Sequence, residues 1–334
     1  MAYTWVRFLF ISLLQCMGRI RYLLIWIVFL SGCTPAGHWL ASPTPEITFP
    51  AHKTTFTPPA IATPSLLPPT ATPSPAPLNL SNPRTQVLAA GLPDPDDLAL
   101  APDGSIYIST IGDGSVRRYT PAGELETVLT GLSVPEGMLF LPDGSLLIAE
   151  QGQNRLVRYD LTAKTAATFF ELANHSGQEG VDGIALDSHD PASTSLIIPD
   201  SPNGRVLRLS LDGKGVATIA RGLVRPTGAW VEPGGAILLA DEFGDALLRL
   251  GPDGGLEKLA ELPQPDDVVE DGAGNIFACT LVDGAVYVIP AGSNKAHILA
   301  AGFNQPQGLI VTADGNLVVT DSGHGRLVRV LIHP

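Results

Sequence analysis

Four acidic side chains occupy one recurring position of the sequence, and together they could hold a metal ion. Each comes just before a glycine or a second aspartate at the start of a short hydrophobic run: Asp96, Glu136, Asp182 and Asp266. The same position carries Thr227 and Gln307 in two further repeats. Oxygen ligands without cysteine or histidine favour Ca²⁺ or Mg²⁺ over softer metals. The pattern therefore predicts a divalent-cation site, provided that the fold brings these side chains together.

Whatever their role, these acidic side chains would repel one another when ionised. Like charges about 6 Å apart repel by about 3 kcal/mol at an effective dielectric constant of about 20. Proton uptake, water or a bound cation could each relieve this repulsion. A carboxylate before a glycine also often accepts backbone N–H groups in the local turn, so a purely structural role is the alternative for each residue.

The elements that must position these residues are repeats of one unit. The stretch "PDGSIYISTIGDGSVRRYT" at residues 102–120 returns as "PDGSLLIAEQGQNRLVRYD" at 142–160 and as "ADGNLVVTDSGHGRLVRVL" at 313–331. Six repeat starts lie 39 to 46 residues apart, at Asp97, Gly137, Gly183, Gly228, Asp267 and Gly308. Short alternating stretches separated by Gly-containing turns are typical of an antiparallel meander. A period of this length indicates a β-propeller.

The two ends of the repeat region complement each other. The last repeat lacks a fourth strand, and "VLAAGLPDPDD" at 87–97 matches "ILAAGFNQPQG" at 298–308. We therefore expect Thr85–Ala90 to complete the sixth blade. The prediction for residues 84–334 is an all-β, six-bladed propeller with four-stranded blades, closed by an N-terminal strand.

A second polar set should lie at the same mouth of the channel, because the second strand of a meander blade ends where the first begins. Its members are Thr110, Glu150, Asp200, Asp241, Thr280 and Asp321, and their sequence context favours capped loops. Arg155, Arg205 and Arg326 recur at the start of the third strand, where we expect them to pair with a loop carboxylate or carbonyl. Trp230 is expected to pack between blades.

Several motifs resemble known propeller families. "DSGHGRLVRV" and "EQGQNRLVRY" resemble the NHL repeat, and "PEGMLFLPDGSLLIAE" and "VDGIALD" resemble the gluconolactonase/regucalcin family. That resemblance implies a divalent cation at the mouth, held by a Glu before Gly and an Asp before Gly, which match Glu136 and Asp182. The family's Asn ligand has no match, because Thr227 and Gln307 stand at the equivalent positions; Asp266 could substitute for it. The fold itself hosts lactonases, other enzymes and binding domains.

The N-terminal region reads as a targeting segment followed by a tether. Residues 17–33, "MGRIRYLLIWIVFLSGC", combine a basic start, a short apolar run and Leu-Ser-Gly-Cys, which resembles a bacterial lipoprotein signal with Cys33 as the lipidated residue. We assign residues 1–33 to the signal, with Met17 as an alternative start. Residues 34–83 are rich in Pro, Thr and Ser and are predicted to be a disordered linker. The predicted location is the outer side of the bacterial cell membrane.

The net charge and the sequence motifs limit the functions that this chain could have. The net charge is −13, and the first 83 residues are net positive, so the propeller is strongly acidic and unsuited to nucleic acid. Contact with the membrane is expected only through the lipid anchor, and we expect a monomer. We favour a propeller mouth that binds a small molecule, glycan or protein partner, with Ca²⁺ or another divalent cation as cofactor. A metal-dependent hydrolase of lactones or esters is the alternative, although no catalytic residue stands out.

Overall fold

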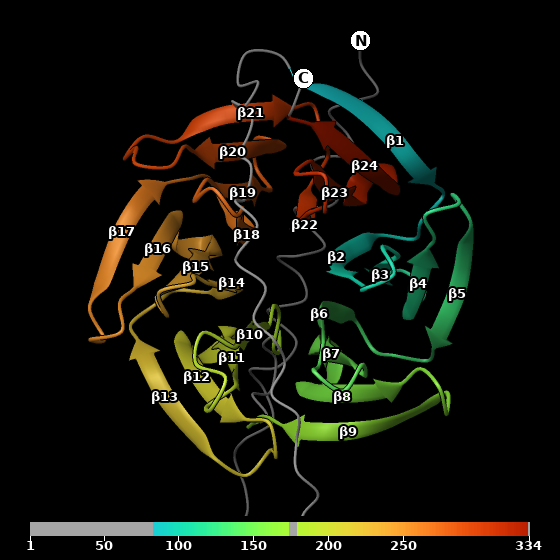
Figure 1. Ribbon diagram of the computed structural model, residues 1–334, viewed down its shortest axis with the longest axis horizontal. Coiled ribbons are helices and arrows are strands. Elements are labelled where there is room, and N and C mark those ends of the chain that lie inside the picture. Colours follow the sequence, from blue (N-terminus) through green and yellow to red (C-terminus); the bar gives the residue numbers. More distant parts are fainter. Residues whose placement is uncertain (1–82, 174–178, 333–334) are drawn as a thin grey trace, which may run out of the picture. The chain divides into compact units, whose positions relative to one another are not determined.

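The computed structural model describes residues 83–173 and 179–332. This part of the chain forms six four-stranded antiparallel sheets, arranged as blades around a central channel (Figure 1). The predicted six-bladed all-β propeller is confirmed. The signal region with Cys33, and the linker as far as residue 82, lie outside the described residues. Within the described segments, no helix is long and apolar enough to cross a membrane.

The first three blades follow one another along the chain. Blade one contains β2 (Pro95–Leu100), β3 (Ile106–Thr110), β4 (Ser115–Tyr119) and β5 (Leu125–Thr130). Blade two contains β6 (Pro135–Phe140), β7 (Leu146–Glu150), β8 (Arg155–Asp160) and β9 (Thr165–Glu171). Blade three contains β10 (Ala185–Asp187), β11 (Ser195–Asp200), β12 (Arg205–Ser210) and β13 (Val216–Arg221).

The last three blades repeat the arrangement, and the sixth borrows a strand. Blade four contains β14 (Pro226–Val231), β15 (Ile237–Asp241), β16 (Ala246–Leu250) and β17 (Leu256–Glu261). Blade five contains β18 (Pro265–Glu270), β19 (Ile276–Thr280), β20 (Ala285–Ile289) and β21 (His297–Ala301). Blade six contains β22 (Pro306–Val311), β23 (Leu317–Asp321), β24 (Arg326–Leu331) and β1 (Arg84–Ala90).

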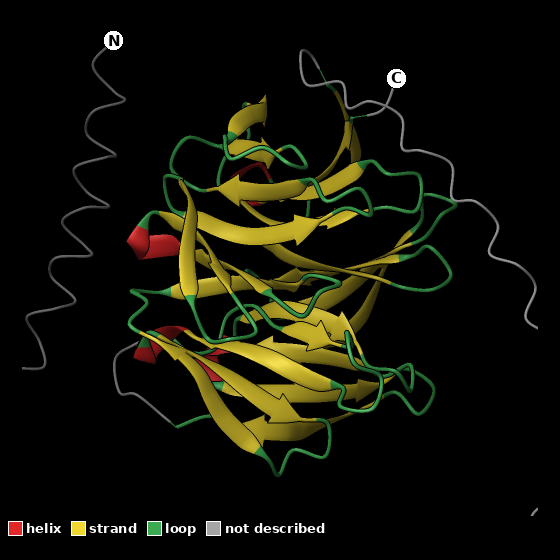
Figure 2. Ribbon diagram, turned by 60° about the vertical axis from the view of Figure 1, so that its left-hand side comes forward, coloured by secondary structure: helices red, strands yellow, loops and turns green. Residues whose placement is uncertain are grey.

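Short 3₁₀ helices follow the second strand in four blades: η1 (Gln151–Gln153), η2 (Ser201–Asn203), η3 (Glu242–Gly244) and η4 (Ser322–His324). Because the start of each first strand pairs with the end of the second, as Pro135 does with Glu150, these helices lie at the face where the first strands begin. They are the red elements of Figure 2. This face carries the acidic residues singled out above.

Strand β1 closes the ring as predicted. It pairs antiparallel with β24, from Arg84 opposite Leu331 to Ala90 opposite Arg326. Leu88 and Ala89 also pack against the cluster of buried side chains between blades six and one. The N-terminal strand therefore completes the sheet and part of a blade interface.

The core consists of six hydrophobic clusters, one between each pair of neighbouring blades. Strand β7 shows how the sequence builds them. Leu146 and Ile148 belong to the cluster shared with blade one, and Leu147 and Ala149 to the cluster shared with blade three. Successive side chains of a strand point to opposite faces, so a strand between two blades is apolar at nearly every position.

Glycines at the repeat starts allow the inner strands to approach closely. A Cβ atom added to Gly228 would lie 2.7 Å from the Asp266 carbonyl oxygen, and one added to Gly308 would lie 2.7 Å from that of Asp96. The neighbouring backbone leaves no room for a side chain at these positions. The channel is consequently narrow at this level.

Candidate functional site: an acidic channel mouth and an apolar vestibule

The structure brings the four predicted acidic residues to one mouth of the channel. Asp96, Glu136 and Asp266 lie in the starts of β2, β6 and β18, and Asp182 lies in the segment before β10. Their exposed fractions are 3%, 6%, 8% and 6% in the order Asp96, Glu136, Asp266 and Asp182. The ring geometry predicted from the repeat is therefore correct, and the assignment of these residues as metal ligands stays a prediction.

The mouth is a place where negative charge is unfavourable. Burial, and then repulsion from Asp182, raises the pKa values of Asp96, Glu136 and Asp266 well above the ordinary values of 3.8 for Asp and 4.5 for Glu. A hydrogen bond with Asp182 further favours protonated Glu136. The Asp96 Oδ2 atom is buried and has no hydrogen-bond partner. Buried carboxylates whose pKa values are raised by burial and by one another are a typical feature of functional sites.

One cation, Arg225, reaches into this mouth from the loop before β14. Its guanidinium lies 2.9 Å from Asp182 Oδ2 and 2.9 Å from Glu179 Oε2, and it also pairs with Glu242. The Phe243 ring stacks against it, 5.3 Å from ring centroid to guanidinium carbon. Burial lowers the pKa of Arg225, but the surrounding carboxylates raise it more, Asp182 most of all. Arg225 is thus a permanent counter-charge for one side of the ring.

Arg225 was not among the predicted site residues, although the sequence contains a signal for it. In four blades the residue just before the proline that opens the first strand has a positive φ: Asp94, Val134, Gln264 and Gln305. Arg225 occupies the same repeat position, is the cationic member of that set and does not share the positive φ. A comparison of this position across the repeats would have identified it.

The chemistry of the mouth suits a hard cation, but the side chains do not converge on one point. The orphaned Asp96 oxygen and the neighbouring Glu136 and Asp266 provide oxygen donors of the kind Ca²⁺ prefers. As the residues lie, however, the described parts of the chain contain no group of three or more His, Cys, Asp or Glu side chains that could hold a metal ion. An ion here therefore requires the carboxylates to turn inward. Arg225 would keep Glu179 and Glu242 as partners if Asp182 turned.

The two positions that replace the expected Asn ligand both act as hydrogen-bond donors. The Thr227 hydroxyl is fully buried and donates a hydrogen bond of 2.8 Å to the Asp266 carbonyl oxygen. The Gln307 amide nitrogen donates to Ser322 Oγ at 3.2 Å. Thr227 thus links blades four and five.

The second polar set serves the loops, as its sequence context predicted. Arg205 donates to Asp200 at 2.6 Å, and the Asp241 carboxylate accepts the backbone N–H groups of Val224 and Arg225 at 3.0 and 2.7 Å. Arg155 and Arg326 likewise pair with Glu150 and Asp321, so the predicted scaffold role of the repeated arginines is confirmed. These carboxylates shape the rim without adding charge to the channel.

Below the acidic ring the channel contracts to a neck of about 20 Å³, lined by the repeat-start residues and by Asp96, Asp182, Asp266 and Gln307. A space of that size holds about one water molecule. Four repeat starts are glycine, and the other two are Asp97 and Asp267. Five carboxylates therefore border this neck: Asp96, Asp97, Asp182, Asp266 and Asp267.

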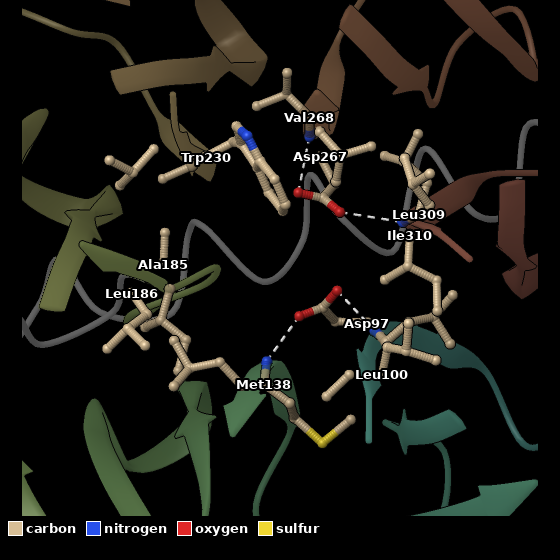
Figure 3. A pocket seen from close by; sticks show the side chains of 18 of the residues that line it. Asp97, Leu100, Met138, Ala185, Leu186, Trp230, Asp267, Val268, Leu309 and Ile310 are labelled. Atoms are coloured by element: carbon tan, nitrogen blue, oxygen red, sulfur yellow. Dashed lines mark hydrogen bonds between the residues drawn. The ribbon is translucent and has the colours of Figure 1, made fainter. Parts of the chain in front are cut away.

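Beyond the neck the channel opens into a vestibule of about 450 Å³. Its walls are mainly aliphatic, and Asp97 and Asp267 face each other at its inner end (Figure 3). Asp97 accepts the N–H groups of Leu98 and Met138, both at 2.7 Å. Asp267 accepts those of Val268 at 2.8 Å and Leu309 at 3.1 Å. Each carboxylate thus joins its blade to the next one.

Both vestibule carboxylates resist ionisation despite these donors. Burial raises the pKa of Asp97 to about 7, and the two backbone N–H groups only partly oppose the rise. Burial and then repulsion from Asp97 raise the pKa of Asp267 well above its ordinary value. Repulsion from Asp182 further disfavours the Asp97 anion, and repulsion from Asp97 disfavours the Asp267 anion.

The position of Trp230 differs from the prediction. Its side chain was expected to pack between blades, but it lines the vestibule and is 36% exposed. Figure 3 shows the indole on the vestibule wall beside Asp267. The alternation of side chains along the inner strand β14 directs Trp230 toward the channel. Because the channel is wide at that level, the ring stays partly uncovered.

The comparisons with known proteins agree with this fold. Residues 94–235 match the family model of the SMP-30/gluconolactonase/LRE-like region, and residues 303–329 match the NHL repeat. Among curated protein sequences, none matches this chain significantly.

Solved structures with the same propeller include a gluconolactonase of Xanthomonas campestris. It has a TM-score of 0.64 at 16% identity, over 76% of this chain and 91% of that one. A calcium-binding protein of Agrobacterium tumefaciens, regucalcin, has a TM-score of 0.62 at 16% identity, over 74% and 92%. Virginiamycin B lyase of Staphylococcus aureus with quinupristin has a TM-score of 0.56 at 15% identity, over 71% and 80%. Likenesses at this level of identity show the fold alone.

Proposed function

We propose that the acidic mouth of this six-bladed propeller, which contains an SMP-30/gluconolactonase/LRE-like region, binds a divalent cation, with Ca²⁺ foremost. The mouth would present the bound cation to a small molecule, glycan or protein partner. The observation that carries the proposal is the buried Asp96 Oδ2, which has no hydrogen-bond partner in a ring that also holds Glu136, Asp182 and Asp266. A cation among these four residues would supply the missing counter-charge. The calcium-binding relative named above supports the choice of ion.

Calcium should stabilise the protein. At a Ca²⁺ concentration of 100 times the dissociation constant, ligand linkage adds about 2.7 kcal/mol to the free energy of unfolding. For a domain of this size that corresponds to a rise in Tm of roughly 5–10 °C. Glu136→Gln removes a charge and a potential bidentate ligand, so its Ca²⁺ affinity should be at least tenfold lower. Calorimetric titration and melting curves, with Ca²⁺ and with chelator, measure both effects.

The matched control is Glu257→Gln on the outer strand β17, where the side chain is exposed and far from the channel. Its Ca²⁺ affinity should equal that of the wild type. A wild-type protein whose melting temperature ignores Ca²⁺, Mg²⁺ and chelator alike would refute the cation site.

A metal-dependent hydrolase of lactones or esters is the second candidate. It is favoured by the family match over residues 94–235, which contains Glu136-Gly137 and Asp182-Gly183. A cation bound there would polarise the carbonyl group of a lactone. The lack of the family's Asn ligand, with Thr227 and Gln307 at the equivalent positions, weighs against it. Ca²⁺-dependent hydrolysis of glucono-1,5-lactone that is lost in Glu136→Gln would favour the enzyme, and Ca²⁺ binding without turnover would favour the binding function.

We also propose that the protein is exported and held on the outer side of the cell membrane by lipid on Cys33, on the basis of the Leu-Ser-Gly-Cys ending of the signal. Mass spectrometry of membrane-extracted protein should find Cys33 as a lipidated N-terminus. A retained signal, or an unmodified Cys33, would reject this anchor. Substituting Cys33 with Ser should release the protein from the membrane fraction while leaving the Ca²⁺-dependent melting temperature unchanged.

A further inference from the structure

The vestibule on the far side of the neck is a second potential binding site with its own chemistry. It is a cavity of about 450 Å³, within the size range of small-molecule sites, and it is lined mainly by apolar side chains of the inner strands. Its polar lining is concentrated at the inner end in Asp97 and Asp267. Among the residues that line it, all of which are described, there is no lysine, arginine or histidine. The acidic mouth differs, because Arg225 is present there.

Two observations indicate that the inner end of the vestibule and the adjoining neck could accept a cationic group. Asp97 and Asp267 face each other across the channel, and each is satisfied only by backbone N–H groups, which leaves the pair without a charged partner (Figure 3). Independently, Asp96 borders the adjoining neck, is 3% exposed and carries a buried oxygen without a hydrogen-bond partner. A donor group placed at the neck could serve all three carboxylates.

The outer part of the vestibule favours an apolar group. Trp230 is 36% exposed on its wall, opposite a surface formed by Leu100, Met138 and Ile310. Beside Trp230, a neighbouring hollow is bordered by Glu270, Asp271 and His189, and by Glu232, which is paired with Arg249. An indole ring next to carboxylates attracts cations as well as apolar groups.

We propose that the vestibule binds an amphipathic amine: the ammonium group lies at the neck between Asp97 and Asp267, and the hydrocarbon body lies along the apolar wall against Trp230. An ammonium group has three donors and no acceptor, which matches a floor made of acceptors. A bound ammonium group would stabilise the ionised form of the two carboxylates, which burial disfavours. A neutral molecule would supply no such counter-charge, and an anion would add a further negative charge beside them. This site opens on the face opposite the proposed cation site and is lined by none of its four acidic residues, although Asp96 of that set borders the adjoining neck.

Calorimetric titration of the full chain with octylamine tests the proposal, with octan-1-ol and octanoate as the matched neutral and anionic probes. All titrations contain chelator, so that the outcome does not depend on Ca²⁺ binding at the mouth. Octylamine should bind with a dissociation constant at least tenfold lower than that of octan-1-ol, and octanoate should not bind measurably. Equal affinity for the amine and the alcohol would overturn the proposal.

Two variants locate the amine. Trp230→Ala removes the exposed wall, and Asp267→Asn removes a floor charge; each should weaken octylamine binding at least tenfold. Phe243→Ala is the control, because Phe243 is an exposed aromatic residue, 55% exposed, at the opposite mouth. Unchanged affinity in Trp230→Ala, or a loss in Phe243→Ala as large as that in Trp230→Ala, would overturn the site. Trp230→Ala decides the question even if Asp267→Asn folds poorly.

Discussion

A chain that lacks Arg84–Ala90 should unfold at a much lower temperature than the wild type, by roughly 10 °C or more. Strand β1 is bonded to β24 over its whole length, and each backbone hydrogen bond contributes about 1 kcal/mol net. Its loss also uncovers Leu88 and Ala89 at a blade interface and leaves β24 as an unpaired edge. For a domain of about 250 residues, a loss of several kcal/mol lowers the Tm by this amount.

The control is deletion of residues 34–77, which removes most of the predicted linker and no described strand. Its melting temperature should match that of the wild type. A synthetic peptide with the sequence of residues 84–90 should partly restore the stability of the shortened chain, because the β24 edge is free to pair with it. Equal melting temperatures for the two deletions would contradict the closing role of β1.

The metal-free protein should lose several kcal/mol of stability between pH 5 and pH 8. The folded state raises the pKa values of Asp96, Glu136, Asp266, Asp97 and Asp267, so it binds more protons than the unfolded chain above pH 4. Stability must then fall as the pH rises through the folded pKa values. For Asp97, the change from 3.8 to about 7 corresponds to roughly 4 kcal/mol at most.

Other carboxylates do not cancel this trend. Asp103, Asp143 and Asp187 have lowered pKa values, so their contribution is present above pH 4 and is lost only at lower pH. Urea unfolding in chelator at pH 5 and pH 8 measures the difference. Glu136→Gln should reduce it, whereas Asp253→Asn, in an exposed turn of blade four, should leave it unchanged. Equal or greater stability at pH 8 would show that burial does not destabilise the ionised channel carboxylates.

The repeat made most of the fold predictable. Six similar units with a fourth strand supplied from the N-terminus leave few arrangements besides a closed ring, and the placement of Asp96, Glu136, Asp182 and Asp266 at one mouth follows from their shared position. The pairing of Arg205 with Asp200 follows from the same logic, since both recur at fixed offsets.

The features that the sequence did not reveal lie where individual blades depart from the repeat. Arg225 enters the mouth through a loop whose backbone differs from that of four other blades. The exposure of Trp230 depends on the width of the channel, which is set by the distance between strands of different blades rather than by alternation within one strand. Asp97 and Asp267 were visible as exceptions among glycines, but their bonds to Met138 and Leu309 of the adjacent blades were not.

The closing strand also fixes the order in which the protein can mature. During synthesis β1 emerges before any other strand of the propeller, yet its partner β24 follows about 240 residues later. Until then β1 has an unpaired edge, and blades one to five must form without closure. Contacts between residues so far apart in sequence slow folding and prolong the time during which edges are exposed. We therefore expect a late, slow folding phase in which blade six assembles last, and ribosome-bound chains that stop before residue 326 should remain sensitive to proteases.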